Sequence, residues 1–112
     1  MSRPARPLSD RLAAIRAALL ALDELCAGTL VHRTTVCGKP ACRCATDPAA
    51  RHGPYYQWSR LEHGRLVRTA LTAAQARRLR RAIKNERRAR ALLARWGRET
   101  GKAILTDRNG TD

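Results

Sequence analysis

The sequence predicts an α+β fold: an N-terminal helix, a small three-stranded antiparallel sheet with a cysteine-rich loop, and a long basic C-terminal helix. Three observations lead to it. Apolar residues recur at helical spacing near both ends of the chain. Short segments rich in β-branched and aromatic residues occupy the middle, and three of the four cysteines stand close together between them. At 112 residues, we expect 1–112 to fold as a single domain.

The first element is a helix over residues 9–26. Ser9 is the predicted N-cap, and Gly28 is the stop signal that follows. A narrow apolar stripe runs along this helix through Leu12, Ile15, Leu19 and Leu22. Cys26 continues the stripe, which favours a core position for its thiol; a metal ligand is the alternative.

Residues 29–71 are predicted to form the sheet and its loop. Strands are expected at 29–36, 55–62 and 65–71, and His63-Gly64 suits the tight turn of a hairpin. Alternation puts Tyr56, Trp58 and Arg60 on one face of the middle strand, and Tyr55, Gln57, Ser59 and Leu61 on the other. The alternation does not decide which face is buried.

The last helix is expected over residues 73–96. Thr72 and Gln75 have the spacing of a capping box, and Gly97 marks the expected end. The predicted core face contains Ala76, Leu79, Ala82, Ile83, Ala89, Leu93 and Trp96. The opposite face contains Arg77, Arg80, Arg81, Lys84, Arg87, Arg88, Arg95 and Arg98. Residues 102–112 are expected to be a mobile tail.

The net charge of +14 implies a polyanionic partner. The basic face itself contains no acidic residue, so its cations repel one another until an anion binds. We therefore predict nucleic-acid binding, with DNA favoured over RNA; a solvated face and an acidic protein or membrane surface are the alternatives. The predicted contacts are Arg77, Arg80, Arg81, Lys84, Arg87, Arg88 and Arg95 on the helix, and Arg60, Arg65 and Arg68 in the sheet.

Other sheet residues extend this prediction. Arg33 adds a further phosphate contact, and Tyr56 or Trp58 offers a ring for stacking. Core packing is the favoured alternative for both aromatic rings, because the chain has no Phe.

The chain shows no apolar run long enough to span a bilayer and no signal-peptide core, so we expect a cytoplasmic protein without a membrane partner. In a reducing compartment, closely spaced cysteines more often bind metal than form disulfides.

The cysteine loop has the spacing Cys37-x4-Cys42-x-Cys44-x7-His52. Three thiolates and one imidazole match the tetrahedral preference of Zn²⁺, and four protein ligands indicate a structural site. His32 and His63 are rival fourth ligands. The alternatives to zinc are a reduced thiol cluster, a Cys42/Cys44 redox pair, and an iron–sulfur cluster that includes Cys26.

The strings CGKPACRC and HGPYYQWSR, followed by a basic strand and a TAAQ helix start, resemble a family of short bacterial proteins of unknown function. The resemblance covers about residues 28–96, and its shared motif includes Cys37, Cys42, Cys44 and His52. It implies an association with mobile elements, and hence a transposase as a candidate partner.

No carboxylate cluster, phosphate-binding glycine loop or convincing nucleophile–base pair is visible in the sequence. A nucleophilic site built from Cys44 and His52 is the remaining enzymatic alternative. We predict a non-enzymatic, zinc-stabilised nucleic-acid-binding module, accessory to a mobile element. The alternative is a protein-interaction adaptor whose long helix docks on a larger nucleoprotein partner. A homodimer is compatible with both.

Overall fold

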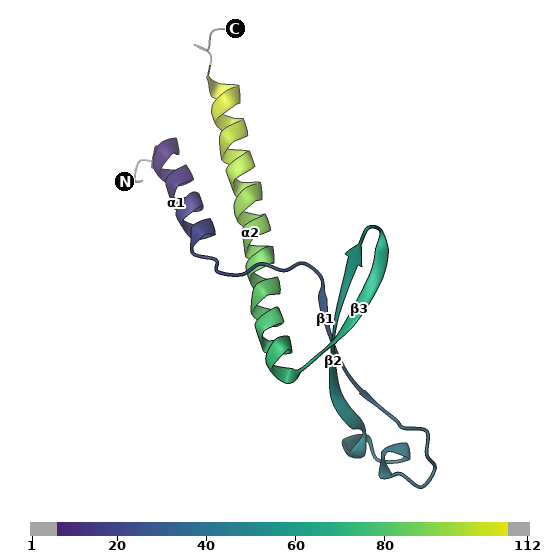
Figure 1. Ribbon diagram of the computed structural model, residues 1–112. Helices are drawn as coiled ribbons and strands as arrows, with labels where there is room; N and C mark the ends of the chain where they lie inside the picture. The colour runs from purple at the N-terminus through teal and green to yellow at the C-terminus, as the bar shows by residue number, and fades with distance from the viewer. Residues whose placement is uncertain (1–6, 108–112) are drawn as a thin grey trace. The chain divides into compact units, whose positions relative to one another are not determined.

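The computed structural model describes residues 7–107, and these residues form two helices and one three-stranded antiparallel sheet (Figure 1). This confirms the α+β fold class. The elements in chain order are α1 (Leu8–Leu20), β1 (Thr29–Thr35), the 3₁₀ turns η1 (Arg43–Ala45) and η2 (Pro48–Ala50), β2 (His52–Glu62), β3 (Arg65–Leu71) and α2 (Ala73–Thr106).

The chain divides into two compact units, which are described separately below. The helical unit comprises residues 1–25 and 84–112, and the sheet unit comprises residues 26–83. Helix α2 contributes its first turns to the sheet unit and the rest to the helical unit. The single-domain organisation stays a prediction.

Helix α1 differs from its predicted bounds at both ends. Its N-cap is Pro7, whose carbonyl accepts from the backbone N–H groups of Asp10 and Arg11 at 3.1 Å, so the expected Ser9 cap is wrong. The helix ends at Leu20 instead of continuing to Cys26.

Polar contacts explain why α1 ends early. The Asp23 carboxylate accepts from the backbone N–H of Glu24 at 2.8 Å, a local bond that competes with helix formation. The Asn85 side chain donates to Asp23 Oδ1 at 3.1 Å and to the Glu24 carbonyl at 2.9 Å. These bonds give polar groups of Asp23 and Glu24 hydrogen-bond partners in a conformation that is not helical.

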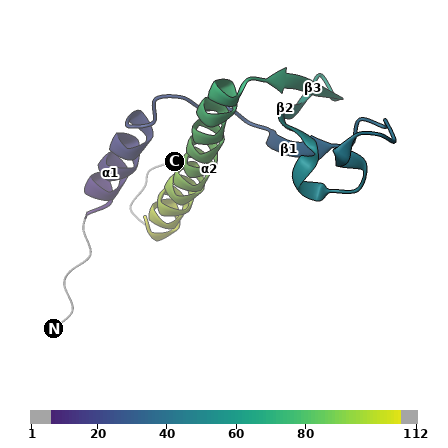
Figure 2. The same cartoon turned by 90° about the horizontal axis from the view of Figure 1, so that it is seen from below.

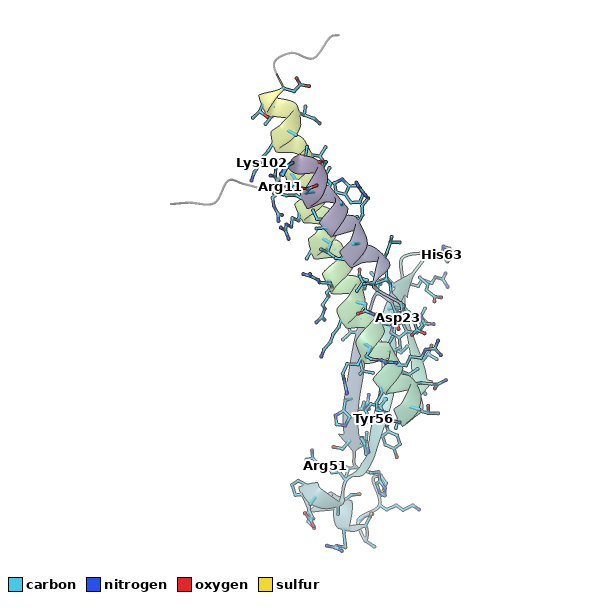
Figure 3. The ribbon with its side chains drawn as sticks, turned by 90° about the vertical axis from the view of Figure 1, so that its left-hand side faces the viewer. Arg11, Asp23, Arg51, Tyr56, His63 and Lys102 are labelled. Atoms are coloured by element: carbon cyan, nitrogen blue, oxygen red, sulfur yellow. The ribbon has the colours of Figure 1, made fainter. Side chains whose placement is uncertain are left out.

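In the helical unit, α1 runs antiparallel to the second part of α2. Arg11 Nε binds Glu99 Oε2 at 3.1 Å, and the Arg16 guanidinium lies 5.7 Å from the centre of the Trp96 ring. Figure 3 shows Arg11 and Lys102 at the same end of this helix pair. Ile15 is buried on α1.

The buried residues of α2 in this unit are Ala89 and Leu92. The expected core residue Leu93 is instead 56% exposed, so that prediction is wrong. Successive side chains of a helix point about 100° apart, so only one of two adjacent leucines can face α1. The sequence does not say which of the two faces α1.

Helix α2 continues past Gly97 to Thr106, so the predicted end near residue 96 is wrong. Residues 102–106, expected in a mobile tail, are helical, and 108–112 lie outside the described residues. Each helical glycine costs about 1 kcal/mol relative to alanine, a cost that tertiary contacts can offset. Contacts of Trp96 and Glu99 with α1 offset this cost.

The sheet has the order β1-β2-β3. His32 pairs with Tyr56 and Tyr56 with Leu71, so these three side chains share a face. His63 and Gly64 both have positive φ, 51° and 79°, as the predicted tight turn requires. Figure 3 shows this hairpin turn and Arg51 at opposite ends of the sheet, with Tyr56 between them.

The register defines two faces. The Trp58 face consists of Leu30, His32, Tyr56, Trp58, Arg60, Glu62, Arg65, Val67, Thr69 and Leu71. The Tyr55 face consists of Thr29, Val31, Arg33, Tyr55, Gln57, Ser59, Leu61, Leu66, Arg68 and Ala70. The predicted alternation along β2 is therefore confirmed.

Trp58 anchors the segment that precedes β1. Its Nε1 donates to the Ala27 carbonyl at 2.9 Å. Gly28 adopts φ +120°, and a Cβ there would lie 2.5 Å from Trp58 Nε1 and 2.7 Å from the Ser59 carbonyl oxygen. Only glycine fits this close approach without strain.

The start of α2 confirms the capping box. Thr72 N–H donates to Gln75 Oε1 at 2.8 Å, and Gln75 N–H donates to Thr72 Oγ1 at 3.1 Å. Within the sheet unit, α2 buries Ala76, Leu79, Ala82 and Ile83, as predicted. Across residues 7–107, neither helix is apolar over a stretch long enough to cross a bilayer.

Candidate metal centre and basic surfaces

The four predicted metal ligands lie together at one end of the sheet unit. The Sγ atoms of Cys37, Cys42 and Cys44 and a ring nitrogen of His52 are all within 4.8 Å of one another. The Cys37 and Cys44 sulfurs are 3.5 Å apart, and Cys42 Sγ is 3.5 Å from His52 Nε2. These residues can hold a metal ion.

The loop between β1 and β2 builds the cluster in steps, and Figure 2 shows it beyond the ends of these strands. Thr35 pairs with His52, which brings the two ends of the loop together. The Cys42 N–H donates to the Lys39 carbonyl at 3.1 Å, which closes a turn between the first two cysteines.

The two 3₁₀ turns complete the loop. Turn η1 places Cys44 in the interior, where it is 3% exposed. The Asp47 side chain caps η2 by accepting from the Ala49 N–H at 3.0 Å. Because η2 leads directly into β2, this cap helps to set the position of His52.

The geometry fits a tetrahedral ion. With Zn–S distances of about 2.3 Å and Zn–N distances of about 2.0 Å, ligand atoms lie roughly 3.5–3.8 Å apart. The observed separations start at 3.5 Å, so only small movements are needed to close the site. A disulfide needs sulfurs about 2.05 Å apart, and all four cysteines are free.

The pKa values of the Cys42 and Cys44 thiols are shifted in opposite directions. The backbone N–H of Cys44, and then the side chains of Cys44 and Cys37, bond to the Cys42 sulfur and lower the pKa of that thiol. The backbone N–H of Cys37 donates to the Cys44 sulfur at 3.4 Å and favours its thiolate. Burial and the neighbouring sulfurs of Cys42 and Cys37 outweigh this bond and raise the pKa of the Cys44 thiol. A divalent cation would favour thiolates at all three positions.

The rival ligands lie elsewhere. The His32 ring stacks 5.1 Å from that of Tyr56, and His63 forms the hairpin turn. Cys26 donates its backbone N–H to the Ala82 carbonyl at 3.2 Å. Among residues 7–107, the ligand atoms that gather are those of Cys37, Cys42, Cys44 and His52.

The predicted nucleic-acid contacts on α2 are exposed. In the sheet unit, Arg77, Arg80 and Arg81 line a depression of about 500 Å³ on the first turns of the helix. In the helical unit, Lys84, Arg87, Arg88 and Arg95 are exposed, as is Arg98. The two acids within α2 are engaged, Glu86 with Arg90 and Glu99 with Arg11.

The sheet candidates differ from one another. Arg65 and Arg68 are exposed. Arg60 is held in the sheet: its guanidinium lies 3.9 Å from the centre of the Trp58 ring and bonds to Glu62 and Thr69 at 2.8 Å. A phosphate would have to compete with these bonds, so Arg60 is a weaker candidate than the sequence indicates.

The aromatic candidates are also engaged. Trp58 contacts Ala27 and Arg60, and Tyr56 contacts His32, so both rings serve the sheet itself. Tyr55, which was not among the residues predicted to stack, is 49% exposed on the opposite face. The signal for it was the alternation along β2, which separates adjacent tyrosines.

A family model described as a domain of unknown function (DUF6788) matches residues 5–81. The match spans α1, the metal-ligand cluster, the sheet and the first turns of α2. No curated protein and no solved structure matches the chain.

Proposed function

Because the chain belongs to the DUF6788 family, a domain of unknown function, we propose its activity from its own residues: a zinc-stabilised, non-enzymatic nucleic-acid-binding module, with DNA favoured over RNA. Its biological role is that of an accessory to a mobile element, with a transposase as the candidate protein partner. The metal is Zn²⁺, held by Cys37, Cys42, Cys44 and His52.

One observation carries the nucleic-acid proposal. Arg77, Arg80 and Arg81 stand at positions i, i+3 and i+4 of α2, so their side chains share one side of the helix. All three are exposed, and the acids within α2 are engaged with other arginines. Three uncompensated guanidinium groups around one depression match the charge of a phosphate backbone.

The metal cluster supports a structural role instead of catalysis. Four protein ligands fill a tetrahedral zinc ion, which leaves no position for water or substrate. The ion would hold together the ends of β1 and β2, and so keep the arginines of the sheet in place.

The test is a salt series. A fluorescein-labelled DNA duplex is titrated by anisotropy at several salt concentrations, and log K should fall steeply with log salt. Replacing Arg77, Arg80 and Arg81 together by Gln should reduce the slope by about 2.7, since each phosphate contact contributes about 0.9.

The matched control is the same triple replacement by Lys, which keeps the charge and should retain most of the slope. Metal content and far-UV circular dichroism check that both variants fold. Absence of binding by the wild-type protein to any polynucleotide at low salt contradicts the proposal.

A second candidate function is the adaptor. Leu20, Leu93, Ile104 and Leu105 are all at least half exposed in the helical unit, and exposed apolar side chains on a helix pair favour a protein contact. Light scattering tests a homodimer directly. Replacing Leu93 and Leu105 by Gln should leave DNA affinity unchanged and remove self-association, whereas loss of DNA binding would tie the two functions together.

A further inference from the structure

The two faces of the sheet offer very different surfaces. On the Trp58 face, Arg60 spans the Trp58 ring and bonds to Glu62 and Thr69. On the Tyr55 face, the Tyr55 side chain is 49% exposed, and among residues 7–107 its ring stacks on no other ring or guanidinium. The aromatic ring that is free to meet a ligand is therefore on the Tyr55 face.

The position of Tyr55 in the register explains its exposure. Strand β3 ends at Leu71, opposite Tyr56, so Tyr55 has a cross-strand neighbour only on β1, where it pairs with Arg33. An aromatic ring and a guanidinium thus stand side by side at the end of the sheet. Both residues are exposed.

A depression adjoins this pair. Its volume is about 340 Å³, and it is lined by residues of the Tyr55 face (Arg33, Tyr55, Gln57 and Ala70) together with Thr35, Pro54, Tyr56 and Leu71. Gln57 is the next residue of β2 on the same face, so its amide adds a hydrogen-bond donor and acceptor beside the ring. A flat, polar-edged group fits this combination better than an aliphatic one.

The charge of the Tyr55 face indicates which class of ligand it binds. The Tyr55 face carries Arg33 and Arg68 and no acidic residue, whereas Glu62 stands at the end of the Trp58 face. Arg68 flanks Ser59, four residues along β2 from Tyr55, which corresponds to roughly 14 Å. Cations at two places along one face suit phosphates that lie a few nucleotides apart on one strand.

We propose that the Tyr55 face binds a single-stranded polynucleotide, with an unpaired base stacked on Tyr55 and phosphates contacted by Arg33 and Arg68. This inference rests on the proposed function and specifies its substrate as a strand with exposed bases. In a duplex the bases are stacked on one another, and their faces cannot reach a ring on a sheet surface.

The test compares three fluorescein-labelled DNA probes by anisotropy. They are an oligodeoxythymidylate of about 12 nucleotides, within the site sizes of known single-strand binders, a strand of the same length with abasic sites at its centre, and a duplex of equal length. The abasic strand keeps all the phosphates and removes the base rings from its centre. The wild-type protein should bind the thymidylate strand more tightly than the abasic strand.

The decisive variant is Tyr55→Leu, which keeps an apolar side chain and removes the aromatic ring. Its affinity for the thymidylate strand should fall on the order of 5- to 100-fold, with unchanged affinity for the abasic strand and the duplex. Tyr55→Phe is the matched control and should bind like the wild type. Metal content and circular dichroism confirm that both variants are folded.

Arg33→Gln provides a second readout. It should lower the salt slope for the thymidylate strand by about 0.7, the contribution of one phosphate contact on a single strand. Equal binding of all three probes with no effect of Tyr55→Leu overturns this inference but leaves the proposed function standing. An equal loss for all three probes also overturns it, because the ring would then not act by stacking. No binding to any probe at low salt contradicts the proposed function itself.

Discussion

The helical unit and the loop of residues 36–51 are held together by different means. In the helical unit, Ile15, Ala89 and Leu92 are buried between or along the helices. In the loop, Cys44 is the one buried residue, and its neighbours are a histidine and two more thiols. Buried apolar side chains thus stabilise the helical unit, whereas the loop would depend on a metal ion bound by its thiols and histidine.

The loop needs such a crosslink for an entropic reason. It connects the paired residues Thr35 and His52, and closing a loop of this length costs about 2–3 kcal/mol. Without a buried apolar cluster, little in the loop itself offsets that cost. A metal ion that binds both ends and the middle of the loop would do so.

The largest expected effect is loss of the metal. Cys44→Ser should abolish stoichiometric zinc and release the loop, because structural zinc binding supplies on the order of 10 kcal/mol. Elemental analysis and hydrogen exchange measure the two consequences, and exchange should rise at residues 36–51 but not in α1. His63→Ala is the matched control and should keep its zinc; a metal-free wild type with a protected loop would contradict the comparison.

The next largest effect is expected for a substitution in the helical unit. Ile15→Ala should lower the free energy of unfolding by about 2–4 kcal/mol, since it removes a fully buried side chain. Denaturant titration measures it. Leu20→Ala is the matched control, because Leu20 is 87% exposed and should change stability by less than about 0.5 kcal/mol. If Ile15→Ala and Leu20→Ala lower the free energy of unfolding equally, burial of Ile15 does not stabilise the helical unit.

The two regions should also differ in their response to pH. The raised pKa of Cys44 means that its thiol carries a proton near neutral pH, and metal binding must displace it. Zinc affinity should therefore fall at least about tenfold for each pH unit as pH is lowered from 8 to 6. The lowered pKa of Cys42 makes its proton the easier one to lose. Competition with a chelator measures the affinity, and a pH-independent value would contradict this account.

The smallest expected effect is for a glycine substitution in the sheet unit, where Gly28 and Gly64 can be compared. Gly28→Ala should destabilise the protein by about 1–3 kcal/mol, because it combines positive φ with a Cβ at 2.5 Å from Trp58 Nε1. Gly64→Asn is the matched control: its φ is +79°, and no atom lies within 4 Å of an added Cβ. Thermal unfolding of the zinc-loaded protein compares them, and equal stability of both variants would argue against the close approach at Trp58.

Local features of the structure could be predicted from the sequence. The capping box at Thr72 and Gln75, the His63-Gly64 turn and the alternation along β2 depend on residues near one another in the chain. The metal ligands share this property, since Cys37, Cys42 and Cys44 span eight positions and His52 follows in the same loop. Their spacing and side-chain chemistry alone indicated a common site.

The features that were mispredicted depend on partners far away in the sequence. Asn85 bonds to the segment after α1, which is not helical, and packing within the helical unit buries Leu92 and leaves Leu93 exposed. Likewise, the pairing of β1, β2 and β3 commits Arg60 to the sheet and leaves Tyr55 exposed.

The sequence by itself determined the fold class, the candidate metal-ligand cluster and the basic character of α2, because short-range spacing and composition encode them. Only the tertiary structure decided which helix ends are real, which leucine is buried and which aromatic ring is free. The physical reason is that burial and hydrogen-bond satisfaction are settled by non-local neighbours, whose identity no local pattern contains.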